Sequence, residues 1–293
     1  MAEETIEQNY FQKRLSNLGI TNPEQYTVNN HVYGSFKRGE EGFLERSFEI
    51  FQEDESGNIR ILYPTLDGLK AQWHKKDLKQ AKDYFITRLK APKGDMKYLI
   101  PKGAGTMPFF PPGLIEKFQK QSEIKTLFLT EGAFKAFKGD MHGLDVVGLT
   151  SITHAKDRIT HGLHEDIKTI LKVCKVQRVV WLVDGDCNRL SSKPIEEIED
   201  LYRRPHQFFS SADSIRRYLD EFEIEKWFVH PLSDELDDLG NPKGLDDLLV
   251  SMHGKEQEVV NDLMIFSKRG KFHYFHKINM TWGTSELHRY FHL

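Results

Sequence analysis

Two short hydrophobic runs in the middle of the chain each end in acidic residues. The first, Thr126 to Leu129, is followed by Glu131-Gly132, and the second, Val179 to Val183, by Asp184-Gly185-Asp186. A nearly continuous apolar run of this length is typical of a parallel strand that is covered on both faces. In an open parallel sheet, functional groups collect beyond the carboxyl ends of the strands. We therefore expect Glu131, Asp184 and Asp186 to meet at one edge of a sheet.

Three carboxylates at one sheet edge repel one another, so they either share protons or hold a cation. A hard divalent ion with oxygen ligands, Mg²⁺ or Mn²⁺, neutralises that repulsion near neutral pH without raising each pKa. Gly132 and Gly185 allow the backbone to turn tightly where the strands end. The residue types thus predict a magnesium or manganese site held by Glu131, Asp184 and Asp186.

Strand and helix patterns alternate around these acidic turns. A helix is predicted from Ala133, and a further helix covers the arginine-rich stretch from Arg203 to Leu219. Alternation of this kind predicts an α/β domain with a parallel sheet. The other elements that we expect here are a helix at Gly113 to Gln121, a strand within Leu144 to Ile152, a helix at Leu163 to Cys174 and a last strand at Glu225 to Leu232.

The first third of the chain has a different pattern. An amphipathic helix is indicated within Glu3 to Leu18, with Gly19 near its end. Strand-like runs follow between Tyr33 and Trp73, separated by turn signals at Glu55 to Asn58 and at Asp67-Gly68. We expect a smaller, hairpin-rich α+β domain at residues 1–113.

Charge is segregated along the chain, whose net charge is only −3. Nucleic-acid binding depends on local phosphate contacts, so it requires a basic surface. The stretch from Lys70 to Lys102 supplies one, because it holds nine lysines and an arginine against three aspartates. Arg88 and Lys90 lie in a predicted strand, Tyr84 to Pro92, on one face by the period of two. Arg88 would clamp a phosphate or pair with a carboxylate.

The segment from Lys93 to Gly113 is rich in proline and glycine, which predicts a loop. Within it, Lys102 to Thr106 could present backbone N–H groups to a phosphate, although a linker into the sheet is the simpler interpretation. Phe109 and Phe110 could stack on bases, and anchoring in the core is the simpler interpretation there too.

The two acidic turns, 53 residues apart (184 − 131), together resemble the Toprim domain of bacterial primases, topoisomerases and certain nucleases. The phrase EGAFKA, which contains Lys135, and the phrase KGLDDLL from Lys243 to Leu249 are most similar to primase-like proteins of phages, plasmids and conjugative elements. The stretch from Lys97 to Pro111 also looks like the segment that precedes Toprim in those proteins. The resemblance spans roughly Tyr84 to Leu249.

This resemblance implies a nucleotidyltransferase that makes primers on single-stranded DNA from nucleoside triphosphates. Glu131, Asp184 and Asp186 would hold one or two Mg²⁺ ions, and Lys135 would place a charge near the phosphates. The resemblance also implies a replicative helicase as a possible partner. Residues that would contact template or phosphate are Arg88, Lys90, Lys102 and Lys243.

The domains expected from the resemblance are 1–113, 114–254 for Toprim, and 255–293 as an extension that begins a further module. Asp246 and Asp247 suit the positive end of a helix dipole, or one of them is an extra acidic residue of the site. Two other functions stay open: a Toprim nuclease with water as the nucleophile, and a nucleic-acid-binding module that does little chemistry alone.

Composition bounds the remaining possibilities. The chain has two cysteines, Cys174 and Cys187, which are too few for the zinc module that cellular primases carry and which suggest reduced thiols. His161 and His164 are one helical turn apart, but a zinc site needs further ligands. No apolar run approaches the length needed to cross a bilayer, and the acidic start is unlike a signal peptide. We expect a cytoplasmic protein without membrane contact.

Overall fold

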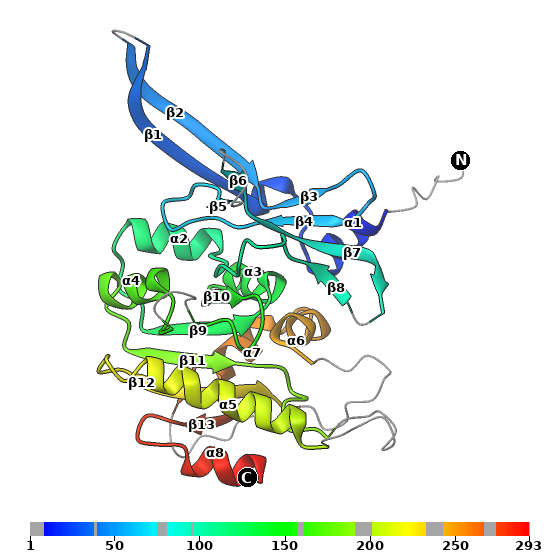
Figure 1. The fold of residues 1–293 in the computed structure, drawn as a ribbon, viewed down its shortest axis with the longest axis vertical. Helices are drawn as coiled ribbons and strands as arrows, with labels where there is room; N and C mark the ends of the chain where they lie inside the picture. The colour runs from blue at the N-terminus through cyan, green and yellow to red at the C-terminus, as the bar shows by residue number, and fades with distance from the viewer. Residues whose placement is uncertain are drawn as a thin grey trace.

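The computed structural model describes residues 9–37, 40–74, 81–94, 96–156, 161–190, 201–232, 243–266 and 274–292. Its centre is a five-stranded sheet in the order β10-β9-β11-β12-β13 (Figure 1). The first four strands run parallel, and β13 is antiparallel to β12. The α/β class with a mainly parallel sheet is therefore confirmed. The strands are β9 (Thr126–Glu131), β10 (Asp145–Leu149), β11 (Arg178–Leu182), β12 (Glu225–Pro231) and β13 (Phe275–Asn279).

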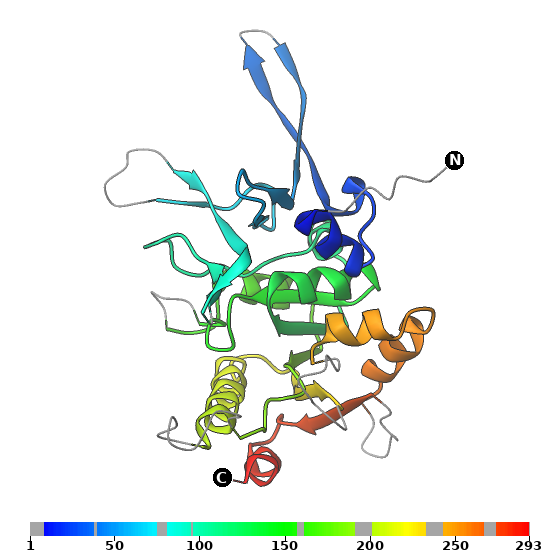
Figure 2. The ribbon, with the colours of Figure 1, turned by 90° about the vertical axis from the view of Figure 1, so that its right-hand side faces the viewer.

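Helices cover both faces of this sheet. Strand β11 shows why: Val180 and Leu182 point into one hydrophobic cluster, whereas Val179 and Trp181 point into another. The first cluster takes apolar residues of α3 (Ala133–Met141), α6 (Leu245–Ser251) and α7 (Glu256–Leu263). The second takes those of α2 (Pro112–Gln119), α4 (Glu165–Val173), α5 (Arg203–Tyr218) and α8 (Ser285–Phe291). Figure 2 shows α6 and α7 on one side and α5 on the other.

The N-terminal part packs onto α3. A four-stranded antiparallel sheet has the order β3-β4-β7-β8, and its Phe51 ring stacks on Phe134 of α3 with centroids 4.9 Å apart. The first hydrophobic cluster thus contains residues from both sides of the predicted boundary at 113, and that boundary stays a prediction. The strands are β3 (Phe51–Glu53), β4 (Ile59–Leu62), β7 (Phe85–Lys93) and β8 (Met96–Leu99), and the helices before them are α1 (Tyr10–Asn17) and η1 (Pro23–Tyr26).

Two further strand pairs complete this part. Strands β1 (Thr27–Lys37) and β2 (Glu40–Glu49) pair only with each other and form an arm that projects from the body (Figures 1 and 2). The short strands β5 (Gln72–Trp73) and β6 (Lys82–Asp83) form the other pair. The two predicted turns are present, with φ of 74° at Gly57 and 73° at Gly68.

Several expectations differ from the structure. Strand β8 lies in the segment that we predicted to be a loop, because Gly94, with φ of 60°, turns the chain back against β7. Strand β12 is not the last one, since β13 joins the same sheet from the segment that we assigned to a C-terminal extension. The predicted helix within Glu3 to Leu18 begins at Tyr10 among the described residues. None of the described helices is long and apolar enough to cross a membrane.

Candidate functional site

A cavity of about 520 Å³ lies where the central sheet meets the N-terminal sheet. Glu131 and Asp184 line it from the ends of β9 and β11, and Lys135 lines it from the first turn of α3. The register explains this meeting: Thr130 pairs with Leu182, so the residues that follow in each strand leave the sheet side by side. From the other side, Arg88 and Tyr98 face the same space. We call it the carboxylate cavity.

Glu131 ends β9 at a turn that requires glycine. Gly132 has a φ of 96° and its N–H donates to the carbonyl of Leu149 on β10 at 2.7 Å. Burial raises the pKa of the Glu131 carboxyl above its ordinary value; Lys135 opposes that rise, and the charges of Asp184 and Asp186 add to it. The carboxylate of Glu131 therefore lies in a setting that favours a proton or a cation beside it.

Lys135 forms an ion pair with Asp184, and both side chains are largely shielded from water, with 16% and 25% exposure. Burial alone would lower the pKa of the Lys135 ammonium, but Asp184, Asp246 and Glu131 outweigh it and raise that pKa. Lys135 is thus a fixed positive charge among carboxylates. The helix turn that follows Gly132 aims it at the acidic turn after β11.

Asp186 has different partners from Asp184 and does not line the carboxylate cavity. Its Oδ2 accepts a hydrogen bond from Arg204 Nη1 of α5 at 2.9 Å and lies 3.6 Å from Lys243 Nζ. Lys243 itself lines the cavity, and its carbonyl accepts the N–H of Gly185 at 2.8 Å. This backbone contact ties the Asp-Gly-Asp turn to the start of α6.

The start of α6 brings two further carboxylates, Asp246 and Asp247, into the carboxylate cavity. Asp246 is 5% exposed, and its Oδ1 has no hydrogen-bond partner among the described residues. Burial raises the pKa of the Asp246 carboxyl, and its nearest ion pair is a long one to Arg14, at 3.8 Å. Asp247 has the helix-end role, because its Oδ2 accepts the N–H of Gly244 at 3.4 Å. The helix-end role is thus shown for Asp247, and an extra acidic residue of the site stays a prediction, since both aspartates line the cavity.

Gly244 is required by crowding and not by its backbone angles. A Cβ there would lie 2.6 Å from Cε of Lys135, 2.8 Å from Oδ1 of Asp246 and 3.0 Å from Oδ1 of Asp184. These distances are shorter than real Cβ contacts. Three charged side chains therefore converge on one glycine.

The fit of a divalent cation can be judged from these groups. In the described part of the chain, no three His, Cys, Asp or Glu side chains gather closely enough to form a ready metal cluster. The donor chemistry is nevertheless that of a hard cation, because the carboxylates of Glu131 and Asp246 are shielded from water and Asp246 Oδ1 lacks a partner. Lys135 lies between carboxylates, at the place where a metal cation would neutralise their charge.

The basic residues that we predicted to contact phosphate separate into two groups. Arg88 reaches the carboxylate cavity, where its Nε donates to the Tyr10 hydroxyl at 3.1 Å and its guanidinium lies 5.2 Å from the centre of the Tyr98 ring. Lys90 and Lys102 do not line this cavity. The backbone N–H of Lys90 instead donates to Asn58 Oδ1 at 3.0 Å.

Other candidates from the sequence have structural roles. Phe109 and Phe110 are buried in the core, at 0% and 1% exposure. His164 caps α4, because its Nδ1 accepts the N–H of Asp166 at 3.3 Å. These positions favour the simpler interpretation of each.

Sequence reasoning missed three lining residues of the carboxylate cavity and the glycine that lies beside it. Arg14 and Tyr98 carry no local signal, since the first lies on α1 and the second on β8, which we had taken for a loop. Lys97 was counted only as part of the basic stretch. Gly244 stood in the phrase KGLDDLL, where a glycine between lysine and a helix start was a usable signal.

Comparisons with protein-family models, with curated proteins and with solved structures found no match for this chain.

Proposed function

We propose that this chain is a primase-like nucleotidyltransferase of the Toprim type, which joins nucleotides on a single-stranded DNA template with Mg²⁺ or Mn²⁺. One observation carries the proposal: Glu131, Lys135 and Asp184, from two acidic turns far apart in sequence, line one cavity opposite Arg88 of the N-terminal sheet. Carboxylates on one wall would bind a metal ion, and cations in the same cavity would bind the phosphates of a nucleotide.

The carboxylates have the metal-binding role in this proposal. Glu131, Asp184 and Asp186 would hold the cation, and Asp246 would add a fourth carboxylate beside Asp184. A bound divalent ion at such a site stabilises the entering and leaving oxygens of an in-line displacement. The Arg204 and Lys243 contacts hold the Asp186 carboxylate in place.

The cations have the phosphate-binding role. Lys135 pairs with Asp184 in the absence of metal. When the Asp184 carboxylate binds a metal ion, the Lys135 ammonium would bind a phosphate oxygen instead. Arg88 is held by the hydroxyls of Tyr10 and Tyr98, which orients its planar guanidinium for a bidentate phosphate contact. Lys97 adds a point charge on the same wall.

A second function is favoured by a different observation. Lys135 already pairs with Asp184, and Arg204 already pairs with Asp186, so these two carboxylates are balanced by cations without a metal. That balance suits a nucleic-acid-binding module which retains the Toprim shape but does little chemistry alone. A Toprim nuclease would use the same carboxylates with water as the nucleophile.

Primer synthesis tests the proposal directly. The protein would be incubated with single-stranded DNA, labelled ribonucleotides and Mg²⁺ or Mn²⁺, and the products separated on a denaturing gel. Asp184→Asn should reduce the yield by about 100-fold or more, the scale seen when one key electrostatic group is removed. The matched control is Lys125→Ala, an exposed lysine on the segment before β9.

Each rival has its own result in these reactions. Metal-dependent nicking without nucleotides would identify a nuclease. Salt-sensitive DNA binding without any product, unchanged when Glu131, Asp184 and Asp186 are all replaced by amides, would identify the binding module. An unchanged primer yield from Asp184→Asn would rule out the carboxylate cavity as the site of synthesis.

A further inference from the structure

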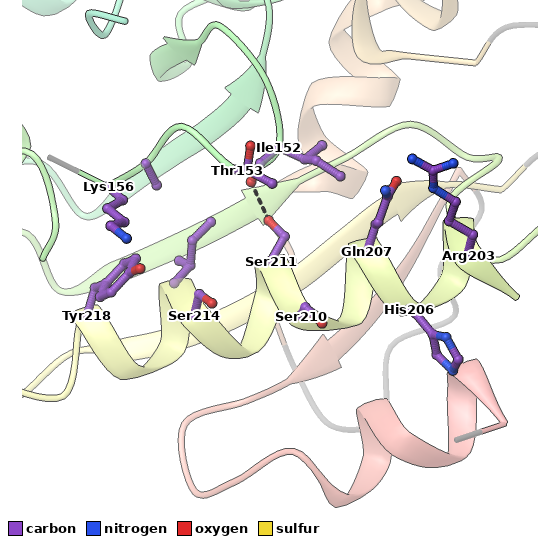
Figure 3. Close-up of a pocket in the computed structure, with 12 residues that line it drawn as sticks. Ile152, Thr153, Lys156, Arg203, His206, Gln207, Ser210, Ser211, Ser214 and Tyr218 are labelled. Carbon is purple, nitrogen blue, oxygen red and sulfur yellow. Dashed lines mark hydrogen bonds between the residues drawn. The ribbon is translucent and has the colours of Figure 1, made fainter. Parts of the chain in front are cut away.

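A second cavity, of about 450 Å³, lies between α5 and the loop that follows β10. Figure 3 shows the helix and the facing loop with the lining residues of the cavity, of which His206 points away from the loop. Those from α5 recur every three or four positions, which places them in one stripe of the helix surface. The opposite side of α5 is buried in the second hydrophobic cluster. The stripe consists of Arg203, Gln207, Ser210, Ser214 and Tyr218, and we call the cavity the α5 groove.

The α5 groove carries positive charge that no described carboxylate balances. No Asp or Glu is among its described lining residues, although the chain as a whole is acidic. Lys156 and Arg203 line it, both are exposed, and neither forms an ion pair with a described residue. The other arginines of α5 are paired: Arg204 with Asp186, Arg216 with Asp213 and Asp220, and Arg217 with Asp213.

Neutral hydrogen-bonding groups lie between these two cations. Ser214 and Gln207 project from α5, and Thr153 faces them from the loop after β10 (Figure 3). Ser211 holds the two walls together, because its hydroxyl donates to the carbonyl of Ile152. Serine, threonine, glutamine and tyrosine side chains are common partners of phosphate oxygens in nucleic-acid complexes. The groove therefore offers donors for a phosphate backbone along its length.

The groove begins beside the carboxylate cavity. At the first turn of α5, Arg203 lines the groove while its neighbour Arg204 holds Asp186. On the facing loop, Thr150 lines the carboxylate cavity and Ile152 lines the groove. The far end holds Lys156 above the ring of Tyr218 (Figure 3). A ligand that filled the groove would thus run along α5, away from the carboxylates.

The length of the groove selects the class of ligand. Arg203 and Tyr218 are 15 residues apart (218 − 203) on one helix, which corresponds to about 22 Å. That distance exceeds one nucleotide but suits an extended single strand, for which grooves of about 4 to 16 nucleotides are typical. At the far end, Tyr218 lines the groove with an aromatic ring that packs partly against the second hydrophobic cluster.

We propose that the α5 groove binds the backbone of single-stranded nucleic acid outside the carboxylate cavity. Lys156 and Arg203 contact phosphates at the two ends, and the hydroxyl and amide groups contact the phosphates between them. That this strand is a template rests on the proposed function, whereas the binding itself requires neither metal nor nucleotides.

The test is equilibrium binding of a fluorescent 16-nucleotide DNA by anisotropy, in EDTA, over a series of salt concentrations. The variant Lys156→Ala/Arg203→Ala should bind about tenfold more weakly near 0.1 M salt. Losing two phosphate contacts should also reduce the slope of log K against log salt by about 1.4, at about 0.7 per contact. The matched control, Lys125→Ala/Arg289→Ala, removes one lysine and one arginine from other exposed positions.

Each outcome decides the proposal. Affinity and salt slope equal to those of the control would overturn it, provided that both variants keep the wild-type unfolding midpoint. Competition by a nucleoside triphosphate or inorganic phosphate at the concentration at which unlabelled DNA competes would overturn the strand as occupant. A protein that makes no primers yet shows the predicted change in salt slope retains the groove and loses only the proposed function.

Discussion

The carboxylate cavity and the α5 groove lie next to each other but handle charge in opposite ways. In the carboxylate cavity, Lys135 and Asp184 neutralise each other behind protein walls. In the α5 groove, Lys156 and Arg203 are exposed and have no described carboxylate beside them. A charge that is shielded from water destabilises the fold unless it is paired, and it interacts strongly with a ligand that enters the cavity. Interactions between exposed charges are weak, and dissolved salt screens them further.

This difference predicts different behaviour for the two regions. The carboxylate cavity should respond to pH and divalent metal, because its groups have shifted pKa values and compete for one another. The α5 groove should respond to ionic strength. Changes in one region should therefore leave the characteristic response of the other intact.

The largest effect is expected from Lys135→Met. Removing the ammonium leaves Asp184 without its ion-pair partner and Asp246 with its 3.8 Å contact to Arg14, and breaking a shielded ion pair typically costs about 3–5 kcal/mol. Mg²⁺ should restore part of this stability, and its effect on the unfolding midpoint should be larger than in the wild type. Thermal unfolding with and without Mg²⁺ measures both quantities.

The control for this variant is Lys117→Met. Lys117 pairs with Asp145 at 2.7 Å but is 43% exposed, so at most about 1 kcal/mol should be lost. If both variants lose the same free energy of unfolding and respond equally to Mg²⁺, the ion pair in the carboxylate cavity is no stronger than an exposed ion pair.

Gly244→Ala should have the next largest effect. The new methyl group would lie within 3.0 Å of Lys135, Asp246 and Asp184, and overpacking typically costs about 1–3 kcal/mol. Denaturant unfolding measures the loss. The double variant Lys135→Ala/Gly244→Ala removes the closest atom, so the added cost of the methyl group should shrink there. A cost that is unchanged in the double variant would contradict the crowding argument.

Glu131→Gln should change how stability depends on pH. Burial raises the pKa of this carboxyl, so the folded state holds a proton more firmly than the unfolded state does. Wild-type stability then falls as pH rises from the ordinary glutamate pKa through the raised value. The amide side chain of the variant does not titrate, so the variant does not lose stability in this way. The variant should therefore be more stable than wild type at pH 7, and the difference should disappear near pH 4. Unfolding curves across this range provide the measurement, and a constant difference would contradict the sign.

The smallest effect is expected from Ser214→Glu in the α5 groove. A carboxylate near bound phosphates should weaken DNA binding by about two- to fivefold, equivalent to about 0.5–1 kcal/mol for an exposed charge interaction. Binding by anisotropy and the Mg²⁺ response of the unfolding midpoint are measured together, and only the first should change. Thr169→Glu, at an exposed position on α4, is the control. A changed Mg²⁺ response would show that the two regions are not separable.

The central sheet could be predicted because its strands carry their own signal. Strands β9 and β11 are buried on both faces, and their short, mainly apolar runs are typical of a covered parallel strand. Strand β13 could not be recognised as a fifth member, because its place depends on pairing with β12 and not on a pattern within Phe275–Asn279. Tertiary context decided its partner.

The candidate site was predictable to the same extent. Two strands of one parallel sheet end at one edge, so Glu131 and Asp184 had to be neighbours once β9 and β11 were adjacent. The sequence spacing did not predict the cationic partner of each carboxylate. Asp184 pairs with Lys135, and Asp186 pairs with Arg204. Tyr98 lay beyond prediction because its position follows from the pairing of β8 with β7.

The pairing of β12 with a strand that follows it in the sequence, β13, has a consequence for biosynthesis. Phe275 packs in the same hydrophobic cluster as Val28, Phe51 and Phe137, so that cluster closes only after β13 has been synthesised. Until then, the outer side of β12, with Trp227 and Val229, has no strand beside it, and an unpaired apolar edge is a template for aggregation. Translation speed and early chaperone contact should therefore govern the yield of this protein.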